Sequence, residues 1–493
     1  MLLLGIDLGT SSVKVSVVEI SSQKAIASAQ FPEAEAEIIA PQPGWAEQDP
    51  EQWWLYVKHA IQKAHATGGY NPADISAIGI AYQMHGLVAL DQTGTPVRNS
   101  IIWCDSRAVP YGEAAFTAIG HQHALENLLN SPGNFTAAKL AWVKANEPEQ
   151  FKRISKVMLP GDFIAFKFSG DITTTESALS EGVFWDFKNN CLSNDVMGYF
   201  GFSQSLIPQI APLFGSHGHV SEKVAGELQL RKGIPVSYKA GDQPNNALSL
   251  NVMKPGEVAA TAGTSGVIYG VADSLVHDQS SRINSFAHVN HTHNAPRVGV
   301  LLCINGCGIL NKSIRQLTGG SLGYNAINHE AATIEAGSNG LTILPFGNGA
   351  ERMLGNQSPG AQVHGWDFNL HGNAHFYRAA QEGVAFAFRY GFDIMRENGM
   401  EPGVIRAGKA NMFLSPVFTQ TVVDVLGIPV ELYDADGSVG AALGAGIGAG
   451  YFGENDLGKG LTLHEVVSPK ASQVYEPVYQ NWLGLLEKSL EKE

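Results

Sequence analysis

The chain opens with a run of apolar residues that is broken by a short polar turn and then resumes. Leu2 to Val17 reads LLLGIDLGTSSVKVSV, and Glu257 to Gly270 reads EVAATAGTSGVIYG. In both segments Gly-Thr-Ser separates two strand-like stretches, which predicts a β-hairpin with a tight turn that starts on glycine. Two such hairpins in one chain indicate two related halves that face each other.

Other apolar runs predict helices that alternate with buried strands, and therefore an α/β chain. A helix is expected from residue 50 to about residue 65, with Asp49 as its N-cap. Strands are expected over residues 75–82, 234–239 and 404–407. Further helices are predicted over residues 138–164, 303–318 and 376–397, and after Asp242.

The last predicted element, residues 437–450, consists largely of Gly and Ala. It is too short to span a membrane. We expect a helix of small residues that packs closely against another backbone.

The bulk properties narrow the class of protein. A chain of 493 residues exceeds what one core usually supports, so we expect two domains, residues 1–244 and 245–493. The net charge of −14 argues against a general affinity for nucleic acid or for anionic membranes. The four cysteines have no paired spacing and the N-terminus has no basic region, so a cytoplasmic protein is expected.

The two hairpin turns offer backbone N–H groups and hydroxyls that can cradle phosphate oxygens. The hydroxyls are those of Thr10 and Ser11 in the first turn and of Thr264 and Ser265 in the second. Only the first turn is preceded by an acid, Asp7. A carboxylate beside a phosphate requires a cation between them, so this turn predicts Mg²⁺ and a nucleotide.

Phosphoryl transfer also requires a base beside the acceptor hydroxyl, and Asp242 is the candidate. It lies between Gly241 and Gln243, where a predicted strand passes into a helix. Capping of that helix by Asp242 is the alternative. His85, at the end of another strand, is either a ligand-binding residue or a satisfied, partly buried histidine. The cluster of His288, His291 and His293 suggests a metal, although an alternating strand and turn explains it as well.

Taken together, these segments resemble the FGGY family of carbohydrate kinases, and within it the xylulokinase branch. The likeness runs in order from residue 5 to residue 446. It is carried by GIDLGTS (5–11), PGWAEQDP (43–50), QMHG (83–86), WCDSR (103–107), GDQ (241–243), GTSG (263–266) and SVGAALGAG (438–446).

The resemblance implies two actin-like, ribonuclease H-like domains with a cleft between them, and a small-molecule sugar and ATP as substrates. It assigns Asp242 as the catalytic base and Asp7 as the acid that holds Mg²⁺. It places the sugar near Met84, His85 and Gln243. The implied nucleotide site comprises Thr10, Ser11, Gly263, Thr264 and Ser265 on the hairpins, and Gly408 and Asn411 at the adenosine turn.

Three departures from the family pattern bear on sugar identity and nucleotide geometry. They are Ala178 in place of the acid of a Ser-Asp-Ala stretch, Ala350 inserted in a Gly-Glu-Arg segment, and Lys409 in a glycine run. The expected reaction is phosphorylation of a primary hydroxyl of a ketopentose, with O5 of D-xylulose favoured. The alternatives are another sugar or polyol (ribulose, glycerol or gluconate) and a non-catalytic actin-like protein that binds ATP. The sequence leaves the oligomeric state open, with a homodimer as one option.

Overall fold

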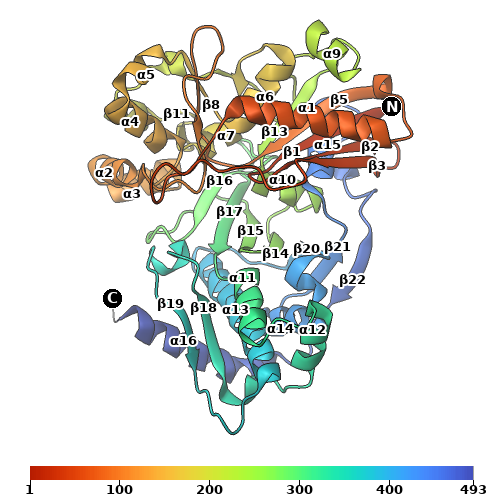
Figure 1. The fold of residues 1–493 in the computed structure, drawn as a ribbon. Helices are drawn as coiled ribbons and strands as arrows, with labels where there is room; N and C mark the ends of the chain where they lie inside the picture. The colour runs from red at the N-terminus through yellow and green to blue at the C-terminus, as the bar shows by residue number, and fades with distance from the viewer. Residues whose placement is uncertain (492–493) are drawn as a thin grey trace.

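The computed structural model describes residues 1–491 and contains two lobes, each built around a β-sheet (Figure 1). The first sheet has the strand order β13-β5-β1-β2-β3. Strands β1, β5 and β13 run parallel, whereas β2 is antiparallel to both of its neighbours. The bounds are β1 Leu2–Leu8, β2 Val13–Glu19, β3 Ala25–Phe31, β5 Ile75–Tyr82 and β13 Val236–Gly241.

The second sheet repeats this arrangement. Its order is β16-β17-β15-β14-β20-β21-β22, in which β14, β20 and β21 run parallel and β15 is antiparallel to β14 and β17. The predicted hairpins form β1–β2 and β14–β15, the central strands of the two sheets, so the prediction of two related halves is confirmed. The bounds are β14 Glu257–Ala262, β15 Gly266–Ala272, β16 Asn284–Ala287, β17 Val298–Ile304, β20 Val404–Gly408, β21 Val430–Tyr433 and β22 Leu463–Val467.

Helices cover both faces of the first sheet. Helices α1 (Pro50–Thr67) and α6 (Pro160–Ser169) share a core with Leu4 and Ile6 of β1, while Leu3 faces the opposite side. The opposite side is covered by α10 (Asp242–Ser249) and α15 (Gly437–Gly448). The second lobe holds α11 Gly308–Leu317, α12 Tyr324–Ala332, α13 Asn373–Glu397, α14 Pro416–Leu426 and α16 Ser472–Leu490.

The Gly/Ala segment forms α15, and it packs on the first sheet although it comes from the C-terminal half of the chain (Figure 1). The approach is close enough that glycine is required on the sheet. A Cβ on Gly79 would lie 1.9 Å from the carbonyl oxygen of Ala441, and one on Gly5 would lie 1.8 Å from that of Ser438. The predicted close packing of a small-residue helix against another backbone is therefore confirmed.

Two predicted helices differ from the structure. Residues 138–164 form α4 (Thr136–Asn146), α5 (Pro148–Arg153), strand β8 (Lys156–Met158) and the start of α6. Proline starts both α5 and α6, because it lacks the N–H group that a helix interior requires. The helix predicted from residue 303 begins at Gly308, since the preceding apolar residues belong to β17, which pairs with β15.

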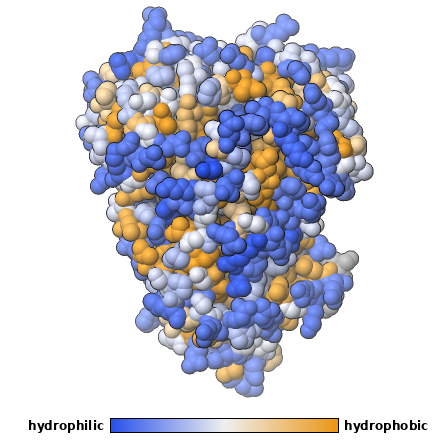
Figure 2. Space-filling view, turned by 180° about the vertical axis from the view of Figure 1, so that it is seen from behind, coloured by the Kyte–Doolittle hydropathy of each residue, from blue (hydrophilic) through white to orange (hydrophobic). Residues whose placement is uncertain are grey.

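Within residues 1–491 no helix is both long enough and apolar enough to cross a membrane. Seen from behind, hydrophobic residues lie at the surface in small groups among hydrophilic ones (Figure 2). All four cysteines are free thiols, as their spacing predicts.

Candidate active site

Asp7 and Asp242 lie at the same edge of the first sheet. Asp7 is the penultimate residue of β1, and Asp242 directly follows β13. These strands are parallel and are separated by β5 alone, so their carboxyl ends are roughly 10 Å apart. The carboxyl edge of parallel strands is where α/β proteins place ligands.

Asp242 is the first residue of α10, and its cap position is occupied by Gly241. The capping alternative for Asp242 is therefore wrong, because the aspartate lies one residue inside the helix. Its side chain is only partly covered, like that of Asp7. A helix N-terminus stabilises a carboxylate there, which suits a residue that must ionise in order to accept a proton.

Both carboxyl groups have raised pKa values, and the charge of Asp7 acts on Asp242. Burial raises the pKa of Asp242 to about 7, and the negative charge of Asp7 adds to that rise. Burial likewise raises the pKa of Asp7 to about 6, with a further rise from Asp436 that Lys14 opposes. Asp436 caps α15, and a Cβ on the next residue, Gly437, would lie 2.3 Å from Asp7 Oδ2. This concentration of negative charge fits a divalent cation bound by Asp7.

A hydrogen-bonded chain links the first hairpin turn to three other segments. Trp103 Nε1 donates to Thr10 Oγ1 (2.9 Å), and Thr10 Oγ1 donates to Gln83 Oε1 (3.3 Å). Gln48 Nε2 donates to the carbonyl of Thr10 (2.8 Å), while Gln83 Nε2 donates to Gln48 Oε1 (2.9 Å). The four motif segments that contain these residues therefore meet at one place. Ser11, next in the turn, is exposed.

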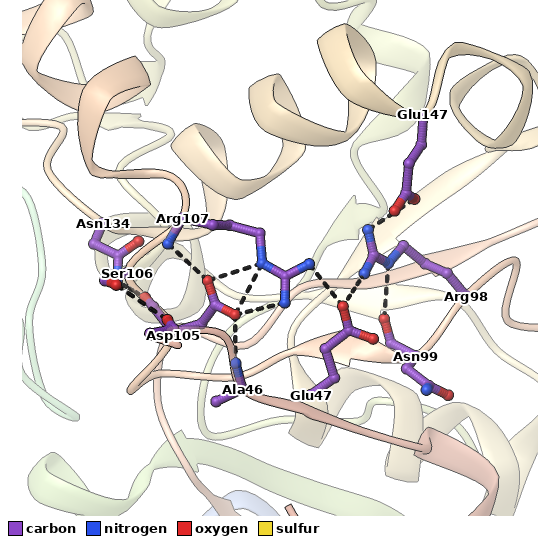
Figure 3. A network of polar contacts seen from close by, with 10 residues as sticks. Ala46, Glu47, Arg98, Asn99, Asp105, Ser106, Arg107, Asn134 and Glu147 are labelled. Atoms are coloured by element: carbon purple, nitrogen blue, oxygen red, sulfur yellow. Dashed lines mark hydrogen bonds and ion pairs between the residues drawn. The ribbon is translucent and has the colours of Figure 1, made fainter. Parts of the chain in front are cut away.

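A buried ionic network fixes the segment that follows Trp103 (Figure 3). The Arg107 guanidinium donates to Asp105 (2.7 Å) and to Glu47 (2.7 Å). Its carbon lies 3.7 Å from the centre of the Trp45 ring. Arg98 bridges Glu47 and Glu147 from the other side. Because Arg107 and Asp105 are almost fully buried, the pairing that satisfies them also determines where Trp103 lies.

Hydrogen bonds and aromatic contacts fix the position of His85. It has a left-handed backbone (φ 61°), and its carbonyl accepts a hydrogen bond from the buried Lys139 (2.8 Å). Its ring contacts Phe135 of one lobe and Phe286 of the other. The ring Nδ1–H donates to the carbonyl of Glu181 (3.0 Å), which leaves Nε2 as an acceptor in the neutral ring.

The charge state of His85 follows from this setting. Burial lowers the pKa of His85 to about 3, and the cations Lys139 and Arg352 act in the same direction. The alternative of a satisfied, partly buried histidine agrees with its packing. It does not account for the remaining acceptor at Nε2, which can accept a hydrogen bond from a ligand hydroxyl group. Met84 is buried beside Gly241, and Gln243 is partly exposed next to Asp242.

The second hairpin turn borders a cavity of about 440 Å³. Its carbonyls at Gly263 and Thr264 accept hydrogen bonds from the first residues of α11, Gly308 (2.8 Å) and Ile309 (3.2 Å). Three residues predicted for the nucleotide line this cavity, namely Gly263, Thr264 and Asn411. The lining also includes polar residues that no motif indicated, among them Asn311, Lys312, Tyr324, Asn325 and Asn328.

Not all predicted nucleotide residues meet in that cavity. Gly408 lines a separate cavity of about 400 Å³, whose wall also includes Lys409 and Asp436. Ser265 lines neither cavity. Asn411 has φ 53°, so the turn that carries it adopts a left-handed conformation suited to asparagine.

Asp242 of the first lobe lies close enough to β17 of the second lobe for its charge to act on Cys303. Burial raises the pKa of Cys303 in β17 to about 12, and the charges of Glu351 and Asp242 contribute. Glu351 accepts a hydrogen bond from the backbone N–H of Asn305 (2.9 Å). Sequence reasoning missed Lys139 and Glu181 as parts of the site, because nothing in their local sequence signals a buried charge. Glu351 lies in the Gly-Glu-Arg segment, which the sequence marked only as a departure from the family pattern.

The histidine cluster has other partners. His288 Nδ1 lies 3.0 Å from the Tyr269 hydroxyl, and His291 lies 3.3 Å from Glu176. Over residues 1–491 no group of three or more His, Cys, Asp or Glu side chains is arranged to hold a metal ion. The hydrogen bonds in this cluster join His288 Nδ1 to Tyr269 and His291 Nδ1 to the carbonyl of Arg297 (3.0 Å).

Family models match both halves of the chain. Residues 2–249 match the N-terminal domain, and residues 258–451 the C-terminal domain, of the FGGY family of carbohydrate kinases. A xylulose kinase of Escherichia coli K12 is 30% identical over 450 residues, covering 90% of this chain and 88% of that protein.

Solved structures share the fold. A xylulose kinase from Rhodospirillum rubrum superposes with a TM-score of 0.89 at 25% identity over 99% of both chains. Glycerol kinase of Plasmodium falciparum with ADP superposes with a TM-score of 0.88, covering 99% of this chain and 98% of that one. At 20% identity the latter is a likeness of fold alone.

Proposed function

The chain belongs to the FGGY family of carbohydrate kinases, and from this premise we propose that it transfers the γ-phosphoryl group of ATP to O5 of D-xylulose. The ATP-dependent sugar kinase activity follows from the family and from its xylulose kinase relatives. The choice of sugar is the proposal.

The observation that carries the proposal is the placement of Asp242, Asp7 and His85 around one sheet edge. An uncharged imidazole with a free acceptor nitrogen suits a hydroxyl-rich, uncharged ligand. Met84 and Gln243, on either side of the Gly241–Asp242 junction, complete the acceptor side. A sugar acid such as gluconate would have to bring a negative charge toward the two aspartates.

In the proposed reaction, Asp242 accepts the proton of the acceptor hydroxyl as its oxygen bonds to the γ-phosphorus. The bond between that phosphorus and the bridging oxygen of ADP breaks, and ADP leaves with the electron pair. Asp7 would hold Mg²⁺, which when bound supplies positive charge for the phosphate oxygens. The hairpin residues Thr10, Ser11, Gly263, Thr264 and Ser265 would surround the phosphates, and Gly408 and Asn411 would contact the nucleoside.

The proposal is tested by ADP release from the purified chain with D-xylulose, D-ribulose, glycerol and gluconate as acceptors. We expect the highest kcat/KM with D-xylulose, about tenfold or more above that with D-ribulose. The two sugars differ only in hydroxyl orientation, so this ratio depends on the hydrogen bonds that the site makes to that hydroxyl group. Preference for another acceptor would overturn the substrate assignment. ATP binding without activity on any acceptor would instead favour the non-catalytic, actin-like protein.

A further inference from the structure

Glu181 is a buried acid that the proposed reaction does not use. It is the last residue of α7 (Glu176–Glu181), and its side chain is almost fully covered. Burial raises the pKa of Glu181 well above its usual value, and the charge of Asp242 adds to the rise. The other groups that face it are Tyr82, His85, Asp162, Lys139 and Tyr269.

Glu181 contacts both sides of the acceptor site. Its carbonyl accepts the Nδ1–H hydrogen bond of His85 (3.0 Å), which fixes the ring tautomer and orientation. Its carboxyl packs against Gly241, the residue before Asp242. A Cβ on Gly241 would lie 2.6 Å from Glu181 Oε2 and 2.7 Å from Met84 Cγ, so only glycine fits beside the carboxyl in this arrangement.

The position of Glu181 is itself set by both lobes. Helix α7 lies against β16 of the second sheet, where Ser177 Oγ donates to the carbonyl of Ala287 (2.9 Å). The backbone N–H of Ala287 donates to Ser180 Oγ (3.0 Å). Phe286, the neighbour of Ala287, contacts the His85 ring. Glu181 therefore occupies a fixed place at the junction of the lobes.

We propose that Glu181 is a positioning residue for the acceptor side of the site, which it orients through its carbonyl at His85 and its carboxyl at the Gly241–Asp242 turn. This inference rests on the proposed function, since it takes those two residues to meet the acceptor. Glu181 acts through them and has no contact with the reacting atoms.

The test compares Glu181→Ala, Glu181→Gln and the matched control Glu176→Gln at the other end of α7. Truncation to Ala removes the support of the turn, and we expect kcat/KM for the acceptor to fall by about 10- to 100-fold. KM for ATP should change less than twofold. Glutamine keeps the volume of the side chain that packs against Gly241, so Glu181→Gln should retain at least a third of parental kcat/KM. Glu176→Gln should match the parent.

Several outcomes would overturn the inference. One is a kcat/KM for the acceptor in Glu181→Ala that equals that of the parent. Another is an equal fall in kcat/KM for the acceptor and for ATP, which would indicate general damage to the fold. A third is a Gln variant as impaired as the Ala variant, which would show that packing is not the basis of the effect.

Two further measurements keep the test decisive. If Glu181→Ala does not fold, Gly241→Ala reports on the same contact from the other side, and it should lower kcat/KM for the acceptor selectively. The kcat/KM of each variant is compared with that of the parent for the acceptor that the parent prefers. A parent that prefers glycerol would therefore refute the xylulose assignment and still test Glu181, whereas a parent with no acceptor would refute both.

Discussion

Asp7 and Asp242 end two parallel strands that are separated by one strand, and the charge of Asp7 raises the pKa of Asp242. Burial is the larger cause of that rise, and the charge of Asp7 adds to it across the sheet edge. A cation at Asp7 would reverse this influence, because it would favour the ionised form of Asp242. Binding of Mg²⁺ with the nucleotide would therefore promote ionisation of Asp242.

Removal of the base tests this assignment directly. Asp242→Asn keeps the shape of the side chain and loses its ability to accept a proton, so kcat should fall by about 10²- to 10⁴-fold. ATP binding, measured by calorimetry without acceptor, should remain within about threefold of the parent, which is under 1 kcal/mol. Asp74→Asn, at an exposed position, is the control. Near-normal turnover in Asp242→Asn would show that another group takes the proton.

The pH dependence of kcat/KM for the acceptor should report the same group. The pKa of Asp242 in the free protein is raised to about 7, and the residue acts as a base only when it is ionised. Activity should therefore be present above pH 7 and fall as the pH drops through that value. In the pH profile of kcat, which reports the complex with Mg²⁺ and ATP, the fall in activity should occur at a lower pH. A profile that is flat from pH 6 to pH 8 would contradict this.

The second hairpin turn offers a test of the nucleotide side. A Cβ on Gly308 would lie 2.4 Å from the Gly263 carbonyl oxygen, so Gly308→Ala must displace the turn. We expect KM for ATP to rise by about tenfold or more while KM for the acceptor changes little. Gly226→Ala, in helix α9 (Glu222–Leu228) where nothing lies near the added methyl group, is the matched control. Equal changes in both KM values would argue against a nucleotide role for this cavity.

Local sequence patterns were sufficient to predict those helices and strands whose ends are marked by a turn or capping residue nearby in the sequence. The hairpins at Gly-Thr-Ser, the cap at Asp49 and the strand before Asp242 were all predictable in this way, and the structure contains each of them. The α/β class and the relation between the halves followed from these elements.

What could not be predicted depends on contacts between distant segments. The apolar run before Gly308 suits a helix as well as a strand, and only pairing with β15 decides for the strand. Glu181 and Lys139 have ordinary neighbours in sequence, so their burial beside His85 arises from how the lobes pack. Asn311 and Tyr324 likewise reach one cavity from two helices.

The contact between α15 and the first sheet should control the stability of the whole chain. Gly79→Ala would place a methyl group 1.9 Å from the Ala441 carbonyl oxygen, and neither backbone can yield without moving its element. We expect a loss of about 1–3 kcal/mol or more in the free energy of unfolding, read as a lower denaturant midpoint. Gly69→Ala, which meets nothing within 4 Å, is the matched control and should leave the midpoint unchanged. Because β1 and β13 flank the strand that carries Gly79, a shift of α15 should also disturb Asp7 and Asp242. Activity of the Gly79→Ala variant should then fall even under conditions in which it remains folded, and full activity in that variant would show that the sheet edge is independent of α15.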